Sequence, residues 1–546
     1  MRQTLRGFFL SFRNQIRRPR SNIHAAPPIA ATGRSSHWLD LTDSISTVNR
    51  NDALWAVREA HEPWDVLVIG GGATGLGTAF DAASRGYRTV LLEQHDFAKA
   101  TSSRSTKLIH GGVRYLRQGN VHLVRESLRE RGLLLQNAPH LVRKLPFVVP
   151  AYAWSDKPFY GIGLKLYDAL AGSLGLGPTQ WLSREETVER VPGVNRAGLR
   201  GGVLYWDAQF DDARLALALA QGVFEQGGVA ANYVRVESLL KTSGGRVCGV
   251  VARDAESSGT FEVKARVVIN ATGVFTDTVR RLDDTNSPAM IAASQGAHIM
   301  IPRGFLLIDS ALMIPNTADG RVLFAIPWHG QMVVGTTDTP VTETPLEPRP
   351  LAAEVDFLLE HVAKYLVTTP SREDVLSTWA GLRPLAKSGS ATATSKLARD
   401  HVIAVSASGL VTIAGGKWTT YRKMAEDAVR KAADVGGLAK RACRTTELKL
   451  PAGGLHSTPP ELSQHLLEAP QSVKPLIEHC VRHEMARTVE DVLARRTRCL
   501  MLDALRAIAL APAVARALAI ELGRDAQWEA EQVRSFSEMA KSYLVR

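Results

Sequence analysis

The sequence is poor in cysteine and has no hydrophobic run long enough to span a membrane. Its four cysteines, Cys248, Cys443, Cys480 and Cys499, are scattered through 546 residues without C-x-x-C spacing. This pattern argues against a structural zinc site or a disulfide framework and is typical of a reducing compartment. No run of about 18 consecutive apolar residues occurs, so a transmembrane helix is not expected.

Acidic residues are missing from the first 39 residues, which carry seven arginines. About +7 of the formal net charge of +12 therefore lies there, and about +5 remains for the rest of the chain. Such a segment resembles a mitochondrial transit peptide; it equally suits a disordered basic arm of a bacterial protein, or a start codon assigned too far upstream. We expect residues 1–62 to be a disordered extension or targeting segment, with ordered sequence beginning near Pro63.

A glycine-rich turn between a strand and a helix predicts a dinucleotide site. Residues 65–70 (DVLVIG) are a short β-branched run, typical of a buried parallel strand. Gly70, Gly72 and Gly75 then form G-x-G-x-x-G, which lets the backbone approach a pyrophosphate at a helix N-terminus. Glu93 follows the next strand, where an acid can accept hydrogen bonds from ribose hydroxyls. The motif alone does not separate NAD from FAD.

The most distinctive motif comes next. Residues 101–116 (TSSRSTKLIHGGVRYL) closely resemble the (S)SKLIHGG(V/L)RYL block of FAD-dependent glycerol-3-phosphate dehydrogenases. Further matches follow in the order of that family, at residues 150–172, 270–277, 298–303, 335–338, 381–384, 395–400, 415–422 and 490–497. The resemblance covers roughly residues 63–546 and implies FAD as the cofactor.

Two departures from the family pattern stand out. Phe275 occupies a position where the family often has Trp, which exchanges one aromatic ring for another. The helical tail contains no D-x-[DN]-x-[DN]-G loop, so calcium regulation is not expected. We predict no bound metal ion.

The order of strand and helix patterns, together with the resemblance, implies an α/β fold (α+β overall). A Rossmann-like FAD-binding domain would carry an inserted antiparallel-sheet substrate domain and be followed by a C-terminal helical domain. The expected segments are 63–145, 195–290 and 375–437 for FAD binding, 146–194 and 291–374 for the substrate domain, and 438–546 for the helices. A β-hairpin is expected around His329-Gly330.

The resemblance also implies which residues contact FAD. Taken alone, the Ser/Thr-rich loop that holds Ser102, Ser103 and Thr106 would be interpreted as an ordinary connection, and so would the turn at residues 271–273. At residues 415–420 a strand ends and a helix begins, so free N–H groups and positive charge there would stabilise reduced flavin. The implied FAD contacts are Gly70, Gly72, Gly75, Glu93, Ser102, Ser103, Thr106, Ala271, Gly273, Gly416, Lys417 and Thr419.

A phosphorylated substrate calls for guanidinium groups, which bind two oxygens at once. By the resemblance, Arg114, Tyr115 and Arg399 are assigned to phosphate binding. Arg383 and Lys417 are placed nearer the C2 hydroxyl and the flavin.

Oxidation of an alcohol also releases a proton, for which histidine is the usual acceptor at neutral pH. His110 and His298 lie in matched blocks and are the catalytic candidates. Buried histidines bonded to the backbone would look the same in the sequence. Cationic neighbours could instead lower the pKa of the alcohol without a discrete base.

These features predict oxidation of sn-glycerol 3-phosphate to dihydroxyacetone phosphate, with electrons passed to a quinone in glycerol catabolism. The alternatives are an oxidase that uses oxygen, an amine-oxidising flavoenzyme of the D-amino-acid oxidase type, and a flavin-binding protein without turnover. The resemblance implies peripheral association with a bacterial cytoplasmic or mitochondrial inner membrane, for which residues 159–177 suit an interfacial segment. It leaves a homodimer open. Nucleic-acid binding is not expected, because no reading module accompanies the basic arm.

Overall fold

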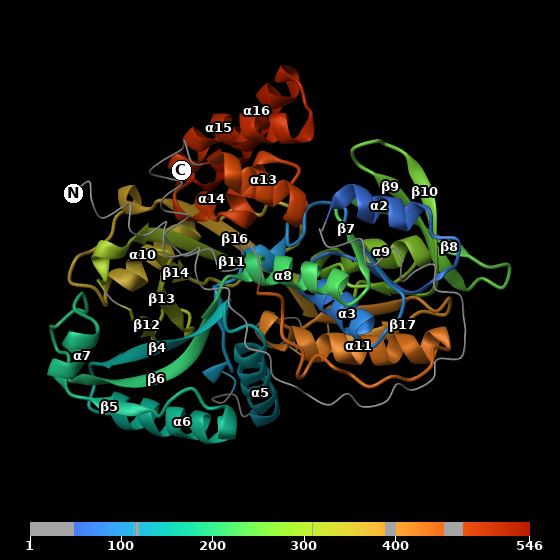
Figure 1. The fold of residues 1–546 in the computed structure, drawn as a ribbon. Helices are drawn as coiled ribbons and strands as arrows, with labels where there is room; N and C mark the ends of the chain where they lie inside the picture. Colours follow the sequence, from blue (N-terminus) through green and yellow to red (C-terminus); the bar gives the residue numbers. More distant parts are fainter. Residues whose placement is uncertain are drawn as a thin grey trace, which may run out of the picture. The chain divides into compact units, whose positions relative to one another are not determined.

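The computed structural model describes residues 49–113, 115, 120–307, 309–387, 400–452 and 473–545. Within these ranges the chain forms a mainly parallel sheet, a large antiparallel sheet and a group of C-terminal helices (Figure 1). This arrangement confirms the predicted α/β fold, with its parallel cofactor sheet, antiparallel substrate sheet and helical C-terminal region.

The parallel sheet has the strand order β17–β18–β10–β1–β2–β7, and β8 and β9 extend it beside β10. The pairs β1–β10, β1–β2, β10–β18 and β2–β7 are parallel, whereas β17 and β18 are antiparallel. Val66, Leu67 and Val68 of β1 are fully buried, as expected for a strand covered on both faces. The strands are β1 (Trp64–Ile69), β2 (Thr89–Leu92), β7 (Val229–Ala231), β8 (Val234–Lys241), β9 (Val247–Asp254), β10 (Thr260–Asn270), β17 (His401–Val405) and β18 (Val411–Gly415).

The antiparallel sheet has the order β15–β11–β14–β13–β12–β4–β6–β3, with β16 also paired to β11 and β5 to β6. β13 and β14 form the predicted hairpin at His329-Gly330, and both turn residues have positive φ, +46° and +77°. The strands are β3 (Leu108–Ile109), β4 (Val142–Ala151), β5 (Gln180–Leu182), β6 (Gly201–Phe210), β11 (Ile291–Pro302), β12 (Ala311–Ile314), β13 (Leu323–Trp328), β14 (Gln331–Gly335), β15 (Thr339–Val341) and β16 (Ser377–Ala386).

Helices cover both sheets. α3 packs against α8 and α11 beside the parallel sheet, and α5 and α6 lie against β4 and β6 of the antiparallel sheet. Among the described residues, no helix is both long enough and apolar enough to cross a membrane. The helices outside the C-terminal group are α2 (Arg50–Arg58), α3 (Ala73–Ser84), α5 (Val121–Asn137), α6 (Asp156–Ala171), α7 (Arg184–Arg190), α8 (Asp212–Glu225), α9 (Thr276–Asp283), α10 (Ala352–Ala363) and α11 (Tyr421–Gly436).

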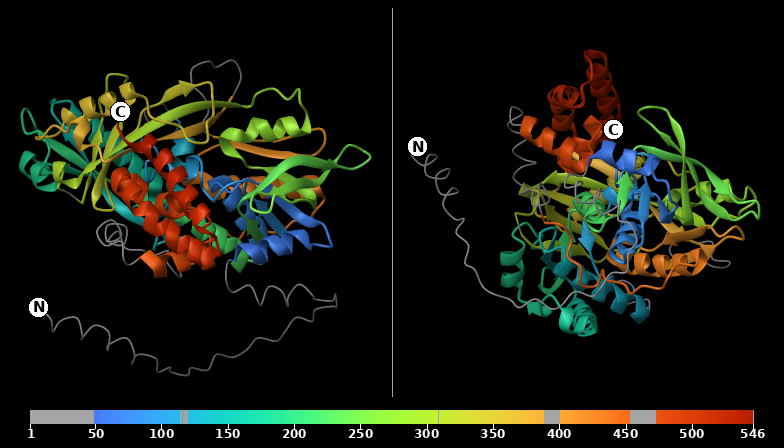
Figure 2. Two further views of the ribbon diagram at one scale, coloured as in Figure 1. Left: turned by 90° about the horizontal axis from the view of Figure 1, so that it is seen from above. Right: turned by 45° about the vertical axis from the view of Figure 1, so that its right-hand side comes forward.

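The C-terminal helices share a hydrophobic core with the antiparallel sheet. Figure 2 shows these helices in two further views. Trp328 and Trp379 belong to this core, so the helices reach the same strands that carry the candidate site. The elements are α13 (Val473–Glu484), η11 (Asp491–Arg496), α14 (Cys499–Leu502), α15 (Ala504–Leu522) and α16 (Ala526–Ala540).

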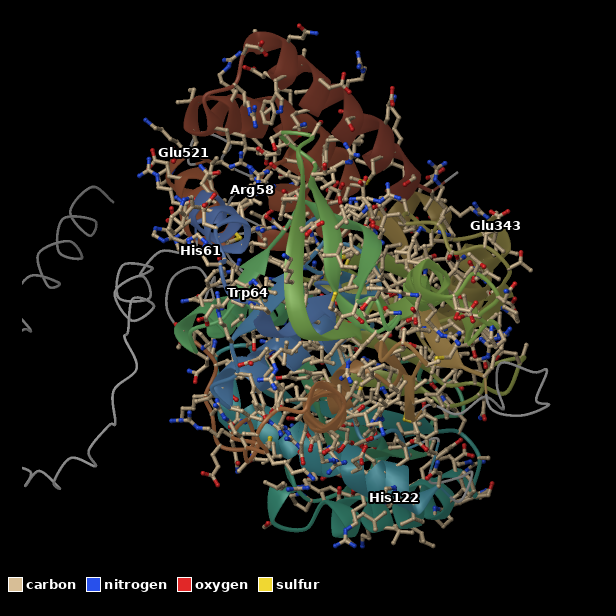
Figure 3. All side chains as sticks on the ribbon, turned by 90° about the vertical axis from the view of Figure 1, so that its right-hand side faces the viewer. Arg58, His61, Trp64, His122, Glu343 and Glu521 are labelled. Atoms are coloured by element: carbon tan, nitrogen blue, oxygen red, sulfur yellow. The ribbon has the colours of Figure 1, made fainter. Side chains whose placement is uncertain are left out.

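Helix α2 shows that ordered structure begins before Pro63, so the predicted disordered extension is wrong from residue 49 onward. Two features hold the helix to the core. Arg50 forms an ion pair of 2.5 Å with the buried Asp254, and Arg58 reaches the same carboxylate at 3.3 Å. Figure 3 labels Arg58 on this helix. The apolar face is also buried, through Ala53, Leu54, Ala56 and Val57. Residues 1–48 lie outside the described residues.

Three strands depart from the expected domain segments. β3, β6 and β16 fall within segments expected to bind FAD, yet all three belong to the antiparallel sheet, where β3 and β4 pair with β6 and β16 pairs with β11. β6 runs almost directly into α8, which packs on α3 at the parallel sheet. A strand that leads from one half of the fold into the other gives no boundary signal in the sequence. The remaining segment boundaries stay a prediction.

Candidate functional site

A cavity of about 390 Å³ lies at the carboxyl ends of the parallel strands. It collects segments that are far apart in the sequence: the glycine turn, the loop after β2, the turn after β10 and the turn after β18. Ligands of open parallel sheets bind at such strand ends. Of the residues expected to contact FAD, the cavity is lined by Gly70, Gly72, Glu93, Ser102, Ala271, Gly273, Gly416 and Lys417.

The glycine turn has the geometry that a pyrophosphate-binding turn needs. Gly70 has a φ of +110°, which side-chain-bearing residues rarely adopt. A Cβ on Gly75 would lie 1.8 Å from the carbonyl oxygen of Gly70, so only glycine allows helix α3 to start this close to β1. Gly72 is the N-cap of α3, and Gly72, Ala73 and Thr74 at this helix N-terminus line the cavity. The residues present therefore fit a dinucleotide, as FAD is.

Glu93 lies in the wall of this cavity and supports the turn. Its carboxylate accepts hydrogen bonds from Gly71 N at 2.5 Å and His95 N at 2.8 Å. Burial raises its pKa, and these two hydrogen bonds act in the opposite direction. A carboxylate has about four lone-pair positions, so it retains capacity to accept ribose hydroxyls.

A second cavity, of about 200 Å³, adjoins the first. The two share Gly416, Lys417 and Trp418, which follow β18, together with Thr101 and Pro384. Gly415 and Gly416 both have positive φ, +82° and +72°, and this turns the chain so that η8 (Trp418–Thr420) begins at the junction. The turn after β18 therefore lies where the two cavities meet.

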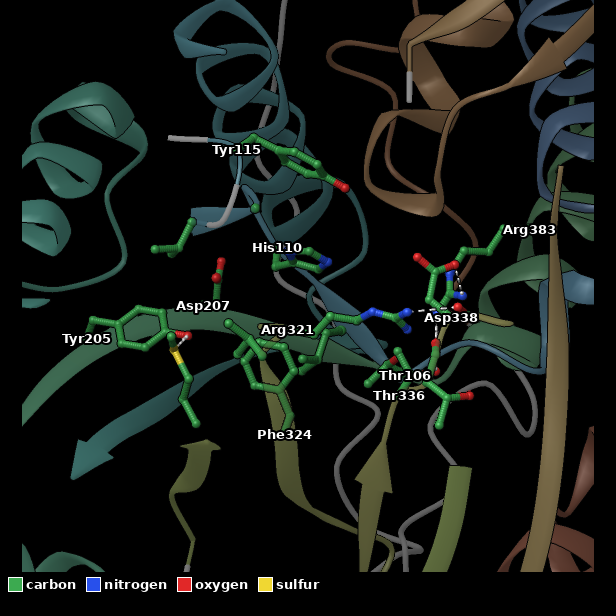
Figure 4. Close-up of a pocket in the computed structure, with 16 residues that line it drawn as sticks. Thr106, His110, Tyr115, Tyr205, Asp207, Arg321, Phe324, Thr336, Asp338 and Arg383 are labelled. Carbon is green, nitrogen blue, oxygen red and sulfur yellow. Dashed lines mark hydrogen bonds and ion pairs between the residues drawn. The ribbon is translucent and has the colours of Figure 1, made fainter. Parts of the chain in front are cut away.

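A third cavity, of about 180 Å³, continues from the second (Figure 4). Both are lined by Thr106, His110, Tyr115 and Arg383. Arg321 also lines the third cavity and points toward Asp338 and Arg383 (Figure 4). The three cavities thus form a series from the glycine turn to a polar end with two arginines.

Arg383 is held in place by β16 and its neighbours. Its guanidinium lies 3.2 Å from the Asp338 carboxylate and donates to the carbonyl oxygen of Thr337 at 3.0 Å. Arg321 donates to the backbone carbonyl of Asp338 at 2.9 Å. A single acidic residue therefore orients two guanidinium groups, and such groups recognise phosphate or carboxylate oxygens.

His298 is fixed on one ring face and at one ring nitrogen. β11 pairs with β16 so that His298 faces Trp379, and the two rings stack with centroids 5.2 Å apart and planes 11° apart. Its Nε2 lies 2.9 Å from Thr106 Oγ1. Burial, followed by the charges of Lys107 and Arg383, holds the pKa of His298 well below its usual range. The imidazole is therefore neutral at physiological pH.

His110 occupies a different position. It follows β3 and lines both the second and third cavities. Its backbone is anchored by Thr419, whose Oγ1 accepts from His110 N at 3.3 Å and donates to His110 O at 3.2 Å. Tyr115 lines the same two cavities, and Lys417 Nζ lies 5.3 Å from the centre of its ring.

Some predicted residues do not line the cavity for which they were proposed. Ser103 is buried, and Thr106 and Thr419 line the second cavity instead of the first. Gly75 acts through helix packing rather than as a wall of the cavity. Arg114 and Arg399 lie outside the described residues, so their assignment to phosphate binding stays a prediction.

Sequence reasoning missed several residues of the site. Arg321 lies outside the matched blocks, and nothing in the local sequence separates it from a surface arginine. Asp338 and Trp418 lie inside matched blocks but received no role; Trp418 donates from Nε1 to the carbonyl oxygen of Ser102 at 2.9 Å. Within the described ranges, no cluster of His, Cys, Asp and Glu side chains is arranged to hold a metal ion.

Comparisons with known proteins agree with this geometry. The FAD-dependent oxidoreductase family model matches residues 65–422, and the model of the C-terminal domain of alpha-glycerophosphate oxidase matches residues 412–530. The mitochondrial glycerol-3-phosphate dehydrogenase of Homo sapiens is 39% identical over 538 residues, covering 88% of this chain and 73% of that protein. The mitochondrial glycerol-3-phosphate dehydrogenase SDP6 of Arabidopsis thaliana is 37% identical, covering 92% and 90%.

A solved structure extends the likeness to the whole fold. The glycerol-3-phosphate dehydrogenase from Bacillus halodurans, complexed with FAD, superposes with a TM-score of 0.73 at 28% identity. The match covers 91% of this chain and 98% of that one, so the C-terminal helices are included. The cofactor is FAD, and the chain belongs to the FAD-dependent glycerol-3-phosphate dehydrogenase family.

Proposed function

We propose that this protein oxidises sn-glycerol 3-phosphate to dihydroxyacetone phosphate and passes the electrons to a membrane quinone. The observation that carries the proposal is the series of three cavities, in which residues shared by neighbouring cavities join the FAD turn to a pair of arginines. Arg383, expected from the sequence nearer the C2 hydroxyl, is assigned here to the phosphate with Arg321, because both side chains line the third cavity. A dianionic phosphate at these two residues would leave the rest of a three-carbon substrate pointing back toward Lys417 and the junction of the cavities.

Different side chains accept the proton, orient the hydroxyl and stabilise the reduced flavin during oxidation of the alcohol. FAD, when bound, accepts the two electrons. We assign the proton of the C2 hydroxyl to His110, because this histidine lines both substrate-facing cavities. Thr106, bonded to the neutral His298, would orient the same hydroxyl. Lys417, at the junction with the FAD cavity, places positive charge where reduced flavin is anionic. Arg114, Tyr115 and Arg399 would complete the phosphate site.

Anaerobic addition of sn-glycerol 3-phosphate to the FAD-loaded protein tests this assignment. The flavin absorbance should bleach, and a soluble quinone analogue should restore it. Arg383→Met should lower kcat/KM by about a hundredfold or more, and Arg383→Lys should recover only part of the loss, because lysine lacks the bidentate fork. Arg303→Met is a matched control, since Arg303 is half exposed and pairs with Asp309 away from the cavities.

Different outcomes would point to the alternatives. Bleaching by D-amino acids but not by glycerol 3-phosphate would indicate an amine-oxidising flavoenzyme. Faster reoxidation by oxygen than by the quinone analogue, with peroxide released, would indicate an oxidase. A flavin that no substrate bleaches would indicate a protein without turnover.

A quinone acceptor requires access to a membrane, and we propose that α6 lies against it. Phe159, Ile162 and Leu166 recur at helical spacing and are 58%, 67% and 50% exposed. Lys165 of the same helix is also exposed, which suits an anionic lipid surface. The buried face of α6 packs on the sheet through Leu164 and Tyr167. These features support peripheral association with a bacterial cytoplasmic or mitochondrial inner membrane, while a homodimer remains a prediction from the resemblance.

A further inference from the structure

Residues 103–107, in the loop after β2, are held in place by a single buried carboxylate. Asp212, in the first turn of α8, accepts hydrogen bonds from Ser105 N at 2.9 Å and Ser105 Oγ at 2.7 Å. Lys107 Nζ contacts both oxygens of the same carboxylate, at 2.9 and 2.8 Å. The side chains of Asp212 and Lys107 are both 0% exposed. Thr106 lies between these two anchored residues.

A second cation reaches the same carboxylate from the C-terminal helical region. Arg498, which directly follows the 490–497 motif, donates from Nη2 to Asp212 Oδ1 at 2.6 Å. The same nitrogen donates to the carbonyl oxygen of Ser103 at 3.1 Å, and Lys107 Nζ donates to that oxygen at 2.8 Å. Arg498 and Lys107 therefore share two acceptors, the carbonyl oxygen of Ser103 and the carboxylate of Asp212 in α8.

The cluster of Asp212, Lys107 and Arg498 also lies beside the Trp379 ring, which stacks on His298. Lys107 Nζ lies 5.7 Å from the centre of the Trp379 ring and 5.3 Å from that of Trp328, and Arg498 lies 5.4 Å from Trp328. The Trp379 ring stacks on His298. His298 thus depends on the cluster twice, through Trp379 at its ring face and through Thr106 at Nε2.

From this arrangement we infer that Arg498 is a positioning residue for the active site. It sets the geometry of the Thr106–His298 pair through Asp212, Lys107 and the Ser103 carbonyl. The C-terminal helical region then contributes to the geometry of the substrate site, although none of its residues that the structure describes lines the three cavities. Reaction at the C2 hydroxyl depends on this pair in the proposed function, on which the inference rests. A misplacement of about 1 Å can cost about a hundredfold in rate.

The pKa of Lys107 agrees with an Asp212 carboxylate that is shared between two cations. Burial, together with the charge of Arg498, lowers the pKa of Lys107 to about 7, although Asp212 opposes the shift. The charged and titratable groups around the lysine are Asp212, Asp211, Arg498 and, across Trp379, His298. Without Arg498, the Asp212 carboxylate would contact one cation instead of two. The Lys107 side chain could then take a different position.

The test compares Arg498→Gln with a matched break in the same interface. Glu484→Gln removes the carboxylate that Arg214 contacts at 2.8 Å, which also joins α8 to the C-terminal helices but leaves residues 103–107 untouched. At saturating glycerol 3-phosphate under anaerobic conditions, Arg498→Gln should reduce its flavin about tenfold to a hundredfold more slowly. FAD content should stay near that of the unaltered protein, and Arg498→Lys should recover most of the rate. Glu484→Gln should lose stability without a slower reduction.

Two further variants test whether Arg498 acts through the Thr106–His298 pair. In a Thr106→Val background, Arg498→Gln should have little further effect on the reduction rate, because both changes act through one pair. Ser105→Ala removes one bond to Asp212 and serves if Arg498→Gln does not fold; it should slow reduction about threefold to tenfold.

A readout without turnover separates this inference from the proposed function. With 13C-labelled histidine, the His298 resonance, identified by its loss in His298→Gln, should shift in Arg498→Gln but not in Glu484→Gln. An unshifted resonance, additive rate effects, or equal slowing by Glu484→Gln would overturn the positioning role. Absence of bleaching in the unaltered protein, with the resonance shifted as expected, would reject the substrate and keep the positioning role.

Discussion

Glu93 closes the FAD-binding turn by accepting the backbone N–H of Gly71 at 2.5 Å, across 22 residues of sequence. Its other oxygen accepts from His95 N, so one carboxylate joins the glycine turn to the loop after β2. The acid therefore has a structural role in the turn as well as a place in the wall of the cavity. The two roles make this residue sensitive to substitution.

We expect Glu93→Ala to weaken FAD binding by about tenfold to a hundredfold, because a hydrogen bond to a charged group contributes about 1.5–3 kcal/mol. Glu93→Gln keeps one acceptor oxygen and should lose less. The measurement is the FAD content of the purified protein and its Kd by flavin fluorescence. Glu262→Gln, at an exposed position of β10, should leave both unchanged. Full FAD content in Glu93→Ala would contradict the role of this carboxylate.

Gly75→Ala should prevent FAD retention. The added Cβ would lie 1.8 Å from the carbonyl oxygen and 2.9 Å from the carbonyl carbon of Gly70, and these backbone atoms cannot move aside as a flexible side chain can. Gly163→Ala is the matched control, because Gly163 also lies in a helix and its added Cβ would meet nothing within 4 Å. This control should gain up to about 1 kcal/mol in free energy of unfolding. Equal flavin absorbance in the two purified variants would show that the turn tolerates a side chain.

The ion pair between Glu484 and Arg214 should make the protein sensitive to acid. Burial alone would raise the pKa of Glu484, but the Arg214 guanidinium holds it well below its usual range. An unfolded glutamate takes up a proton near pH 4.3, whereas this one does not, so the stabilisation is present above about pH 4.3 and is lost as the pH falls.

Glu484→Gln should therefore lower the free energy of unfolding by about 3–5 kcal/mol at pH 7, since it leaves Arg214 buried without its partner. The difference from the unaltered protein should shrink below about pH 4.3. Denaturant titrations at pH 7, 5 and 4 would measure it. Glu360→Gln breaks an ion pair whose side chains are 65% and 53% exposed, and it should change stability by less than about 0.5 kcal/mol. A difference that does not depend on pH would contradict the assignment.

Replacing the apolar face of α6 should weaken membrane binding. Phe159→Glu with Ile162→Glu removes two exposed apolar side chains, each of which contributes about 1.5–3 kcal/mol when buried. Cosedimentation with vesicles of phosphatidylcholine and phosphatidylglycerol should fall by about a hundredfold or more in apparent affinity. Val367→Glu, at a site that is 60% exposed in the connection after α10, should bind as before. Unchanged sedimentation of the double variant would place the membrane contact elsewhere.

The sequence predicted the cofactor side of the site better than the substrate side. Gly70, Gly72 and Glu93 follow a local rule, in which strand, turn and helix are adjacent in the chain. Arg321 and Asp338 come together across the predicted hairpin of β13 and β14, but no local pattern indicates that the open end of this hairpin lines a cavity beside Arg383 of β16. The family blocks located His298, but its partner Trp379 follows from the register of β11 and β16.

The C-terminal helices illustrate the same limit. Their sequence predicted a separate helical domain, since nothing local indicates that Arg498 enters the core of another region. Helix α2 was missed for a different reason: its short apolar face is too weak a signal beside the arginine-rich segment before it. In both places, buried ion pairs with distant carboxylates, Asp212 and Asp254, decide where the segment lies.

The division of the site between two sheets has a consequence for how its specificity can change. Most of the residues that line the FAD cavity follow strands of the parallel sheet, and the antiparallel sheet carries Arg383, His298 and the arginine-lined end. Mutations in β11, β13 and β16 can therefore alter which alcohol or amine is oxidised while the cofactor stays bound. For protein engineers, those three strands are the place to build libraries that seek new substrates.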